Sequence, residues 1–189
     1  MNYELFQWIN NLTVDAPAWL SDSLVFLADK VEYLYIVLLL LLWFLGTGAA
    51  KTENRRTSLY TFLAAMGGFL LSYIIAKLYT HPRPFMVHDV HQLIPHAPEN
   101  SFPSDHATLA FVFAWMLWIR KRSWGYVLLP LAIVVGFARV YGGVHYPMDI
   151  VGGAVVAGVA TWVVLRLTRL WEPLIQLTTK VSKNFTSQG

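Results

Sequence analysis

Two histidines, two arginines and one carboxylate are the residues of this chain whose types best suit chemistry. His145 and Asp149 are four positions apart, so the carboxylate can hold one ring nitrogen and direct the other toward a substrate. His106 supplies a second imidazole, and Arg83 and Arg139 carry planar guanidinium groups that can each donate two hydrogen bonds to a phosphate. This set suits phosphoryl transfer, because charge on the phosphate oxygens must be neutralised while the attacking and leaving atoms are held in line.

The two histidines allow the division of labour that a metal-free phosphatase needs, in which one attacks phosphorus and the other protonates the departing oxygen. We predict that His145 is the nucleophile, because Asp149 can orient it. We predict that His106 is the general acid, because it lies beside a helix start at Ser104, where backbone N–H groups and the helix dipole favour an anion. A single Arg or His at the end of an apolar segment is usually an interfacial anchor, so the prediction depends on the convergence of these residues.

Three further histidines, His88, His91 and His96, lie close together in the sequence and raise the alternative of a metal site. Their spacing matches no common ligand pattern, and the chain has no cysteine that could supply a thiolate. We therefore expect no metal and no other cofactor. These histidines are interpreted as solvated loop residues or as lid residues near the substrate.

The elements that carry these residues are strongly apolar. Of the 189 residues, 56% are hydrophobic and 13% are charged, and the mean hydropathy is +0.49, which is too apolar for a soluble domain of this length. A helix crosses a bilayer with about 20 mainly apolar residues. We therefore predict an all-α fold, a polytopic membrane helical bundle with about five transmembrane helices. The expected spans are Val31–Gly48, Thr57–Tyr79, Ser104–Ile119, Trp124–Tyr141 and Asp149–Leu170.

The N-terminal part of the chain is less apolar than these spans. An apolar helical face is followed by a stretch that acidic residues interrupt, so we predict that residues 2–29 form helices lying in the membrane interface. No secretory signal peptide is recognisable, and the mature chain is expected to begin near Met1. We predict a single membrane phosphatase domain over residues 1–189, with interfacial helices in 1–30, a transmembrane core in 31–170 and a cytoplasmic tail in 171–189.

The positions of the basic residues indicate how the chain is oriented in the membrane. Lys and Arg are retained on the cytoplasmic side, and here they follow the first, third and fifth expected spans. These places share one face of the membrane if the spans alternate, so the residues suited to chemistry are predicted to face the outside of a cytoplasmic membrane. The net charge is +3, but the basic residues lie between apolar runs, and we expect no nucleic-acid partner.

The motifs resemble those of the type 2 phosphatidic acid phosphatase superfamily, whose signature is Lys-x6-Arg-Pro, Pro-Ser-Gly-His and Ser-Arg-x5-His-x3-Asp. The third part is the most specific, and its Arg, His and Asp spacing is complete at Arg139, His145 and Asp149. The second part reads Phe102-Pro103-Ser104-Asp105-His106, in which Asp105 replaces Gly. This form resembles the bacterial undecaprenyl-diphosphatase branch, which includes bacitracin-resistance proteins.

Two other positions depart from the signature. Ala138 stands where the family has Ser before the Arg, and five residues rather than six separate Lys77 from Arg83. The resemblance implies that Arg83, Arg139 and Ser104 bind the substrate phosphate, and we predict that Asp105 and Lys77 belong to the same site.

The resemblance also implies a phosphohistidine intermediate on His145, with His106 as the acid, Asp149 as the orienting carboxylate and no metal. For the bacterial branch, the implied substrate is undecaprenyl diphosphate, which is cleaved to the monophosphate and phosphate so that the carrier lipid can be reused in wall synthesis. The implied location is a bacterial cytoplasmic membrane, with the active site facing the periplasm or the cell exterior.

Three alternatives remain open. A phosphatase of phosphatidylglycerol phosphate, phosphatidate or lipid A would share every catalytic residue and differ only in its lipid groove. The vanadium haloperoxidases resemble the same anion site but are soluble, which the apolar spans argue against. A non-enzymatic lipid-binding or transport protein would bind a polyprenyl or other lipid phosphate without needing the pair of His145 and Asp149.

Overall fold

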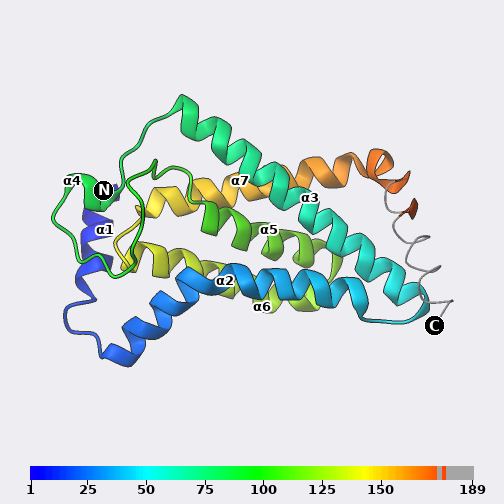
Figure 1. The fold of residues 1–189 in the computed structure, drawn as a ribbon, viewed down its shortest axis with the longest axis horizontal. Helices are drawn as coiled ribbons and strands as arrows, with labels where there is room; N and C mark the ends of the chain where they lie inside the picture. Colours follow the sequence, from blue (N-terminus) through cyan, green and yellow to red (C-terminus); the bar gives the residue numbers. More distant parts are fainter. Residues whose placement is uncertain (174–175, 178–189) are drawn as a thin grey trace.

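The structure is a computed structural model that describes residues 1–173 and 176–177, and this part of the chain is helical without any β-strand. The predicted tail, residues 171–189, lies mostly outside the described residues. The helices are α1 (Asn2–Asn11), α2 (Ala18–Phe44), α3 (Gly48–Leu78), α4 (Pro84–Val87), α5 (Asp105–Arg120), α6 (Arg122–Tyr141) and α7 (Pro147–Arg166) (Figure 1).

The long helices α2, α3, α5, α6 and α7 run along one axis of the molecule, and each contains most of one predicted span (Figure 1). Among the described residues, α3, α6 and α7 are each long and apolar enough to cross a membrane. Helix α5 is shorter, at 16 residues, and packs against all four other long helices, so most of its side chains are buried. The predicted all-α bundle is confirmed, with α5 at its centre.

No break in the helix marks the predicted boundary between interfacial helices and the first span near residue 30, and this boundary stays a prediction. Helix α2 begins at Ala18 and continues without a break to Phe44, because no Gly or Pro interrupts this stretch after Pro17. Of the acidic residues that suggested a separate interfacial helix, Asp22 and Asp29 lie in the N-terminal part of α2, whose other face is buried through Ala28 and Val31. Only α1 is a separate N-terminal helix.

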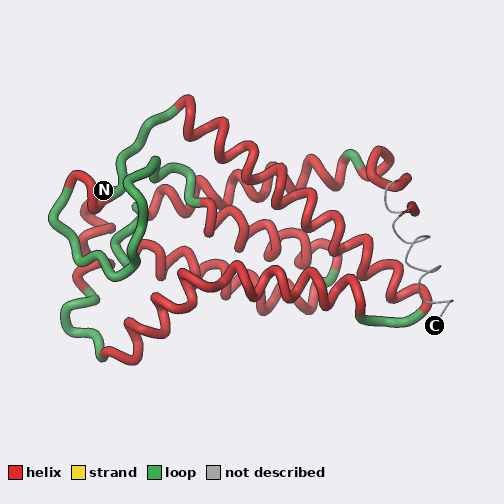
Figure 2. The backbone as a smooth tube through the Cα atoms, in the orientation of Figure 1, coloured by secondary structure: helices red, strands yellow, loops and turns green. Residues whose placement is uncertain are grey.

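The two ends of the bundle differ in character. Most of the connecting loops and the short helices α1 and α4 gather at one end (Figure 2). At the other end, basic side chains from separate helices form ion pairs, in which Arg120 contacts Glu53 and Arg56 contacts Glu172. The described basic residues Arg56 and Arg120, which follow the first and third predicted spans, therefore lie at the same end of the bundle.

The loop that joins α4 to α5 is fixed from both sides. Asn10 of α1 is 2% exposed, and its side-chain amide donates to the carbonyl oxygens of His91 and Tyr141, both at 2.8 Å. Its side-chain oxygen accepts from the backbone N–H of His91 at 2.9 Å. Farther along, Asn100 donates to the carbonyl oxygens of Tyr79 and Phe102 at 3.1 and 2.7 Å. These contacts hold the loop over the ends of α5, α6 and α7.

Candidate active site

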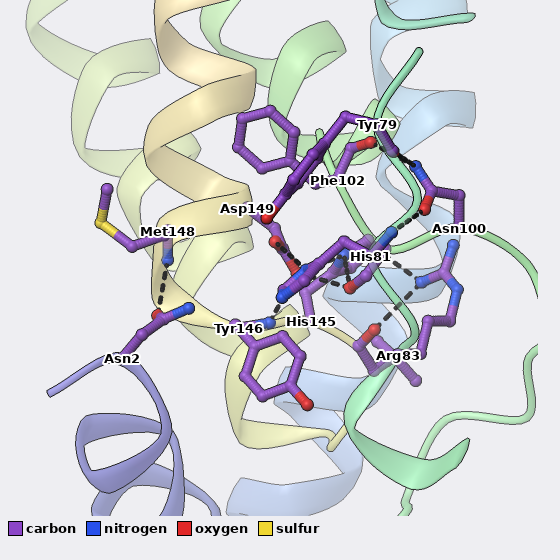
Figure 3. A network of polar contacts seen from close by, with 12 residues as sticks. Asn2, Tyr79, His81, Arg83, Asn100, Phe102, His145, Tyr146, Met148 and Asp149 are labelled. Atoms are coloured by element: carbon purple, nitrogen blue, oxygen red, sulfur yellow. Dashed lines mark hydrogen bonds and ion pairs between the residues drawn. The ribbon is translucent and has the colours of Figure 1, made fainter. Parts of the chain in front are cut away.

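His145 and Asp149 meet at the start of α7, as their spacing predicts. His145 Nδ1 lies 3.4 Å from Asp149 Oδ2, and both side chains are buried. The same oxygen accepts the backbone N–H of Tyr146 at 2.8 Å, so the carboxylate also closes a capping box at the N-terminus of α7. A helix cap and the orientation of the His145 imidazole thus depend on one buried carboxylate (Figure 3).

The contacts of His145 define which ring nitrogen carries the proton. Arg83 Nη1 lies 3.0 Å from His145 Nε2, and a guanidinium can only donate. Nε2 must therefore be the unprotonated nitrogen, and Nδ1 carries the hydrogen toward Asp149. This tautomer is the one that a nucleophile needs, because the lone pair of Nε2 faces the arginine that would hold a phosphate.

The environment of His145 keeps the imidazole neutral. Burial lowers its pKa to about 3, and the positive charges of Arg139 and Arg83 act in the same direction, against the opposing effect of Asp149. A neutral imidazole is a competent nucleophile, whereas an imidazolium has no lone pair to attack with. His145 is therefore in its reactive form at neutral pH.

Two buried guanidinium groups form a site for an anion. Arg83 is 6% exposed and Arg139 is 1% exposed, so both positive charges are largely removed from solvent. Among the described residues, Nε of Arg83 and both Nε and Nη2 of Arg139 have no hydrogen-bond partner. Buried charges and unpaired donors are costly unless a ligand satisfies them, and a phosphate supplies both the negative charge and the acceptor oxygens.

His106 lies in the first turn of α5, and Ser104 is the N-cap residue of this helix. The Ser104 hydroxyl accepts from the backbone N–H of Ala107 at 3.4 Å, so its own O–H can still donate to an anion at the helix start. His106 Nε2 lies 3.4 Å from Glu32 Oε2 of α2. His106 is close enough to Arg139 to interact with its positive charge.

Lys77 and Asp105 line a pocket of about 480 Å³ between the end of α3 and the start of α5. Arg83 also lines this pocket, together with Glu99 and the apolar rings of Phe69, Tyr73 and Phe102. Lys77 Nζ is 5.3 Å from the centroid of the Tyr73 ring. The structure thus brings both residues beside the anion site, with acidic and basic groups in one pocket.

Sequence reasoning missed the role of Ser101. Its side chain is fully buried, and its hydroxyl donates to Asp149 Oδ2 at 2.5 Å and lies 3.4 Å from His145 Nδ1. No spacing signals this contact, because Ser101 precedes the second motif and Asp149 belongs to the third. Ser101 is brought in by its backbone N–H, which donates to the carbonyl of His81 at 2.7 Å.

His81 also contacts the carboxylate, and this contact was not predicted. His81 Nδ1 lies 3.4 Å from Asp149 Oδ1, and its ring packs between those of Tyr79 and Tyr146 (Figure 3). The only sequence signal is its position two residues before Arg83. Asp149 is therefore shared by two imidazoles, one on each oxygen.

The three loop histidines separate in the structure. The His88 ring stacks on Tyr3, with centroids 3.9 Å apart, whereas the His96 ring packs edge-on against His145, with centroids 6.4 Å apart. In the described part of the chain, no group of three or more His, Cys, Asp or Glu side chains could hold a metal ion. Burial and the nearby Arg83 lower the pKa of His96, so this ring lies neutral against the ring of His145. His96 thus matches the lid interpretation.

Residues 56–172 match the PAP2 superfamily, and the chain belongs to this family. The expected family is confirmed, and with it the class of the protein, a membrane-embedded phosphatase. The match includes every residue of the predicted site and leaves out α1 and α2.

Individual relatives agree over most of the chain. The undecaprenyl-diphosphatase BcrC of Bacillus subtilis is 35% identical over 96% of this chain and 91% of that protein. The crystal structure of Aquifex aeolicus LpxE covers 87% of this chain and 94% of its own, with a TM-score of 0.71 and 27% identity. A transmembrane PAP2-type phosphatidylglycerolphosphate phosphatase from Bacillus subtilis has the same fold, with a TM-score of 0.63, 18% identity, and coverage of 88% of this chain and 86% of its own.

Proposed function

We propose that this protein hydrolyses undecaprenyl diphosphate to undecaprenyl phosphate and phosphate through a phosphohistidine on His145. The observation that carries the proposal is the unprotonated Nε2 of His145 directed at the buried guanidinium of Arg83, with unpaired donors of Arg139 beside it. The choice of lipid is supported by similarity to the undecaprenyl-diphosphatase BcrC over nearly the whole chain.

In the first step, the terminal phosphate takes the hydrogen bond that Arg83 now donates to His145. Nε2 attacks phosphorus, the P–O bond to the lipid phosphate breaks, and His106 gives its proton to the departing oxygen. The positive charge that develops on the His145 ring is stabilised by Asp149. In the second step, water attacks phosphorus, the P–N bond breaks, and His106 takes the proton from the water.

The proposed site faces the outer side of a bacterial cytoplasmic membrane. The support is that basic side chains, including Arg56 and Arg120, lie at the opposite end of the bundle. Such residues are retained in the cytoplasm, so the end with the catalytic groups would be outside. This orientation gives the enzyme access to diphosphate lipid released by wall synthesis on that side.

Purified protein tests the proposal in two ways. A phosphate-release panel compares undecaprenyl diphosphate with phosphatidylglycerol phosphate, phosphatidate and lipid A, and we expect the highest kcat/KM for undecaprenyl diphosphate. Acid-quench trapping with labelled substrate should detect a phosphohistidine in the wild type and none in His145→Ala. A glycerolipid preference would overturn the choice of substrate, and a phosphoenzyme that persists in His145→Ala would overturn the mechanism.

A further inference from the structure

Helix α2 contributes to the active site although it lies outside the residues that match the family. The carbonyl oxygen of Ala28 accepts from Arg139 Nη1 at 3.4 Å, and Glu32 Oε2 lies 3.4 Å from His106 Nε2. Ala28 and Glu32 are four residues apart, so they share one face of α2. One face of this helix therefore contacts both a phosphate-binding arginine and the predicted general acid.

The surroundings of His106 make an acidic partner necessary. A general acid must carry its proton when the leaving oxygen departs, and both the burial of His106 and the nearby positive charge of Arg139 disfavour an imidazolium at this place. His145 of the α6–α7 loop, His96 of the α4–α5 loop and Asp29 of α2 also interact with His106. Asp29 is paired with Lys30 at 2.6 Å, which leaves Glu32 as the carboxylate in direct contact with the imidazole.

We propose that Glu32 is a positioning residue that holds His106 and stabilises its protonated form. The inference rests on the proposed function, because it assigns Glu32 to the step in which His106 acts as an acid. The two catalytic histidines then each have a carboxylate, Asp149 for the nucleophile and Glu32 for the acid. The carboxylate of Glu32 also serves the second step. It stabilises the imidazolium that forms again when His106 takes a proton from water.

The position of Glu32 on the rim of the site agrees with this role. Its side chain is 44% exposed, whereas that of His106 is 23% exposed, so the carboxylate contacts both solvent and the imidazole. Partial exposure to solvent weakens the interaction between the charges of Glu32 and His106. The loss of turnover expected when Glu32 is neutralised therefore lies at the low end of the range for an ion pair. We therefore expect a loss of about tenfold when the charge is removed.

The test is Glu32→Gln, which keeps the shape of the side chain and removes the charge. Turnover of undecaprenyl diphosphate is expected to fall about tenfold, with the alkaline limb of its pH profile displaced by about one unit to lower pH. Turnover of a nitrophenyl phosphate should change less than twofold, roughly, because its leaving group needs no proton. Asp22→Asn removes another exposed carboxylate of α2 and should change neither substrate.

A double-mutant comparison separates this inference from the proposed function. In a His106→Ala background, Glu32→Gln should have no further effect, because its contribution passes through the imidazole. If Glu32→Gln slows both substrates equally, or adds its full effect to His106→Ala, Glu32 has a structural role and the inference is wrong. If His106→Ala itself shows no dependence on the leaving group, the assignment of the acid fails, which is a failure of the proposed function.

Discussion

Ser101 should be needed for the phosphorylation of His145 although it is buried behind the reacting atoms. Ser101→Ala removes the hydroxyl that donates to Asp149 Oδ2 at 2.5 Å. That oxygen would keep the backbone N–H of Tyr146 at 2.8 Å and the ring of His145 at 3.4 Å. A hydrogen bond to a charged group contributes about 1.5–3 kcal/mol, and the buried carboxylate has no solvent to replace the lost donor.

The expected loss in phosphorylation rate depends on how much of the free energy of this hydrogen bond is used to hold Asp149 in place. If all of it serves to hold Asp149 for His145, the phosphorylation rate falls about 10- to 150-fold, since each 1.36 kcal/mol is tenfold. We expect KM to change little, because the Ser101 hydroxyl is directed at the carboxylate rather than at the anion site. The loss should therefore appear in kcat.

Rapid-quench measurement of phosphoenzyme formation gives the phosphorylation rate separately from its hydrolysis. Thr161→Val is the matched control, because it removes a buried hydroxyl that has no hydrogen-bond partner among the described residues, farther along α7. A Ser101→Ala enzyme that phosphorylates within about twofold of the wild type would refute the reasoning. A rise in KM with unchanged kcat would instead make Ser101 a substrate contact.

Three further predictions concern packing, pH and topology. Gly153→Ala should lower the free energy of unfolding by about 1–3 kcal/mol in a detergent melt, because its Cβ would lie 2.8 Å from the Ser104 carbonyl oxygen; Gly67→Ala, which meets nothing within 4 Å, should not. Burial lowers the pKa of His145 from 6.5 to about 3, so the unfolded chain binds the extra proton between these values. The contribution of His145 to the free energy of unfolding should therefore be complete above pH 6.5 and fall toward pH 3. His145→Gln should reduce the slope of this free energy against pH by up to about 1.4 kcal/mol per pH unit. An unchanged slope would contradict the lowered pKa of His145. Because the chain has no native cysteine, His91→Cys should react with an impermeant maleimide on intact cells and Ser123→Cys should not; the reverse pattern would invert the topology.

The bundle and the motif residues were predictable because their signals are local. A transmembrane helix requires a long apolar run, and the motif spacing places His145 and Asp149 one helical turn apart. The start of α2 was not predictable from hydropathy, since charges on the outer end of a helix do not end it. Helix ends follow from breakers and caps, and only Pro17 supplies one here.

The contacts missed by sequence reasoning are those between distant segments. Ser101 and Asp149 are 48 residues apart, and their contact depends on the path of the loop after α4. Glu32 lies in the part of the chain where no motif directs attention to any residue. Its pairing with His106 depends on how α2 is rotated against α5, which apolar composition leaves open because the outward face meets lipid.

The attachment of α1 through Asn10 has a consequence for biosynthesis. Its partner carbonyl on Tyr141 is 131 residues farther along the chain, so α1 can reach its final place only after α6 has been made and inserted. Until then, α1 must rest elsewhere, and its exposed Leu5 and Trp8 suit the lipid surface. Since His145 and Asp149 follow Tyr141, the segment that brings His145 and Asp149 together is also made after α6, at the stage when α1 can first hold the loop above the site.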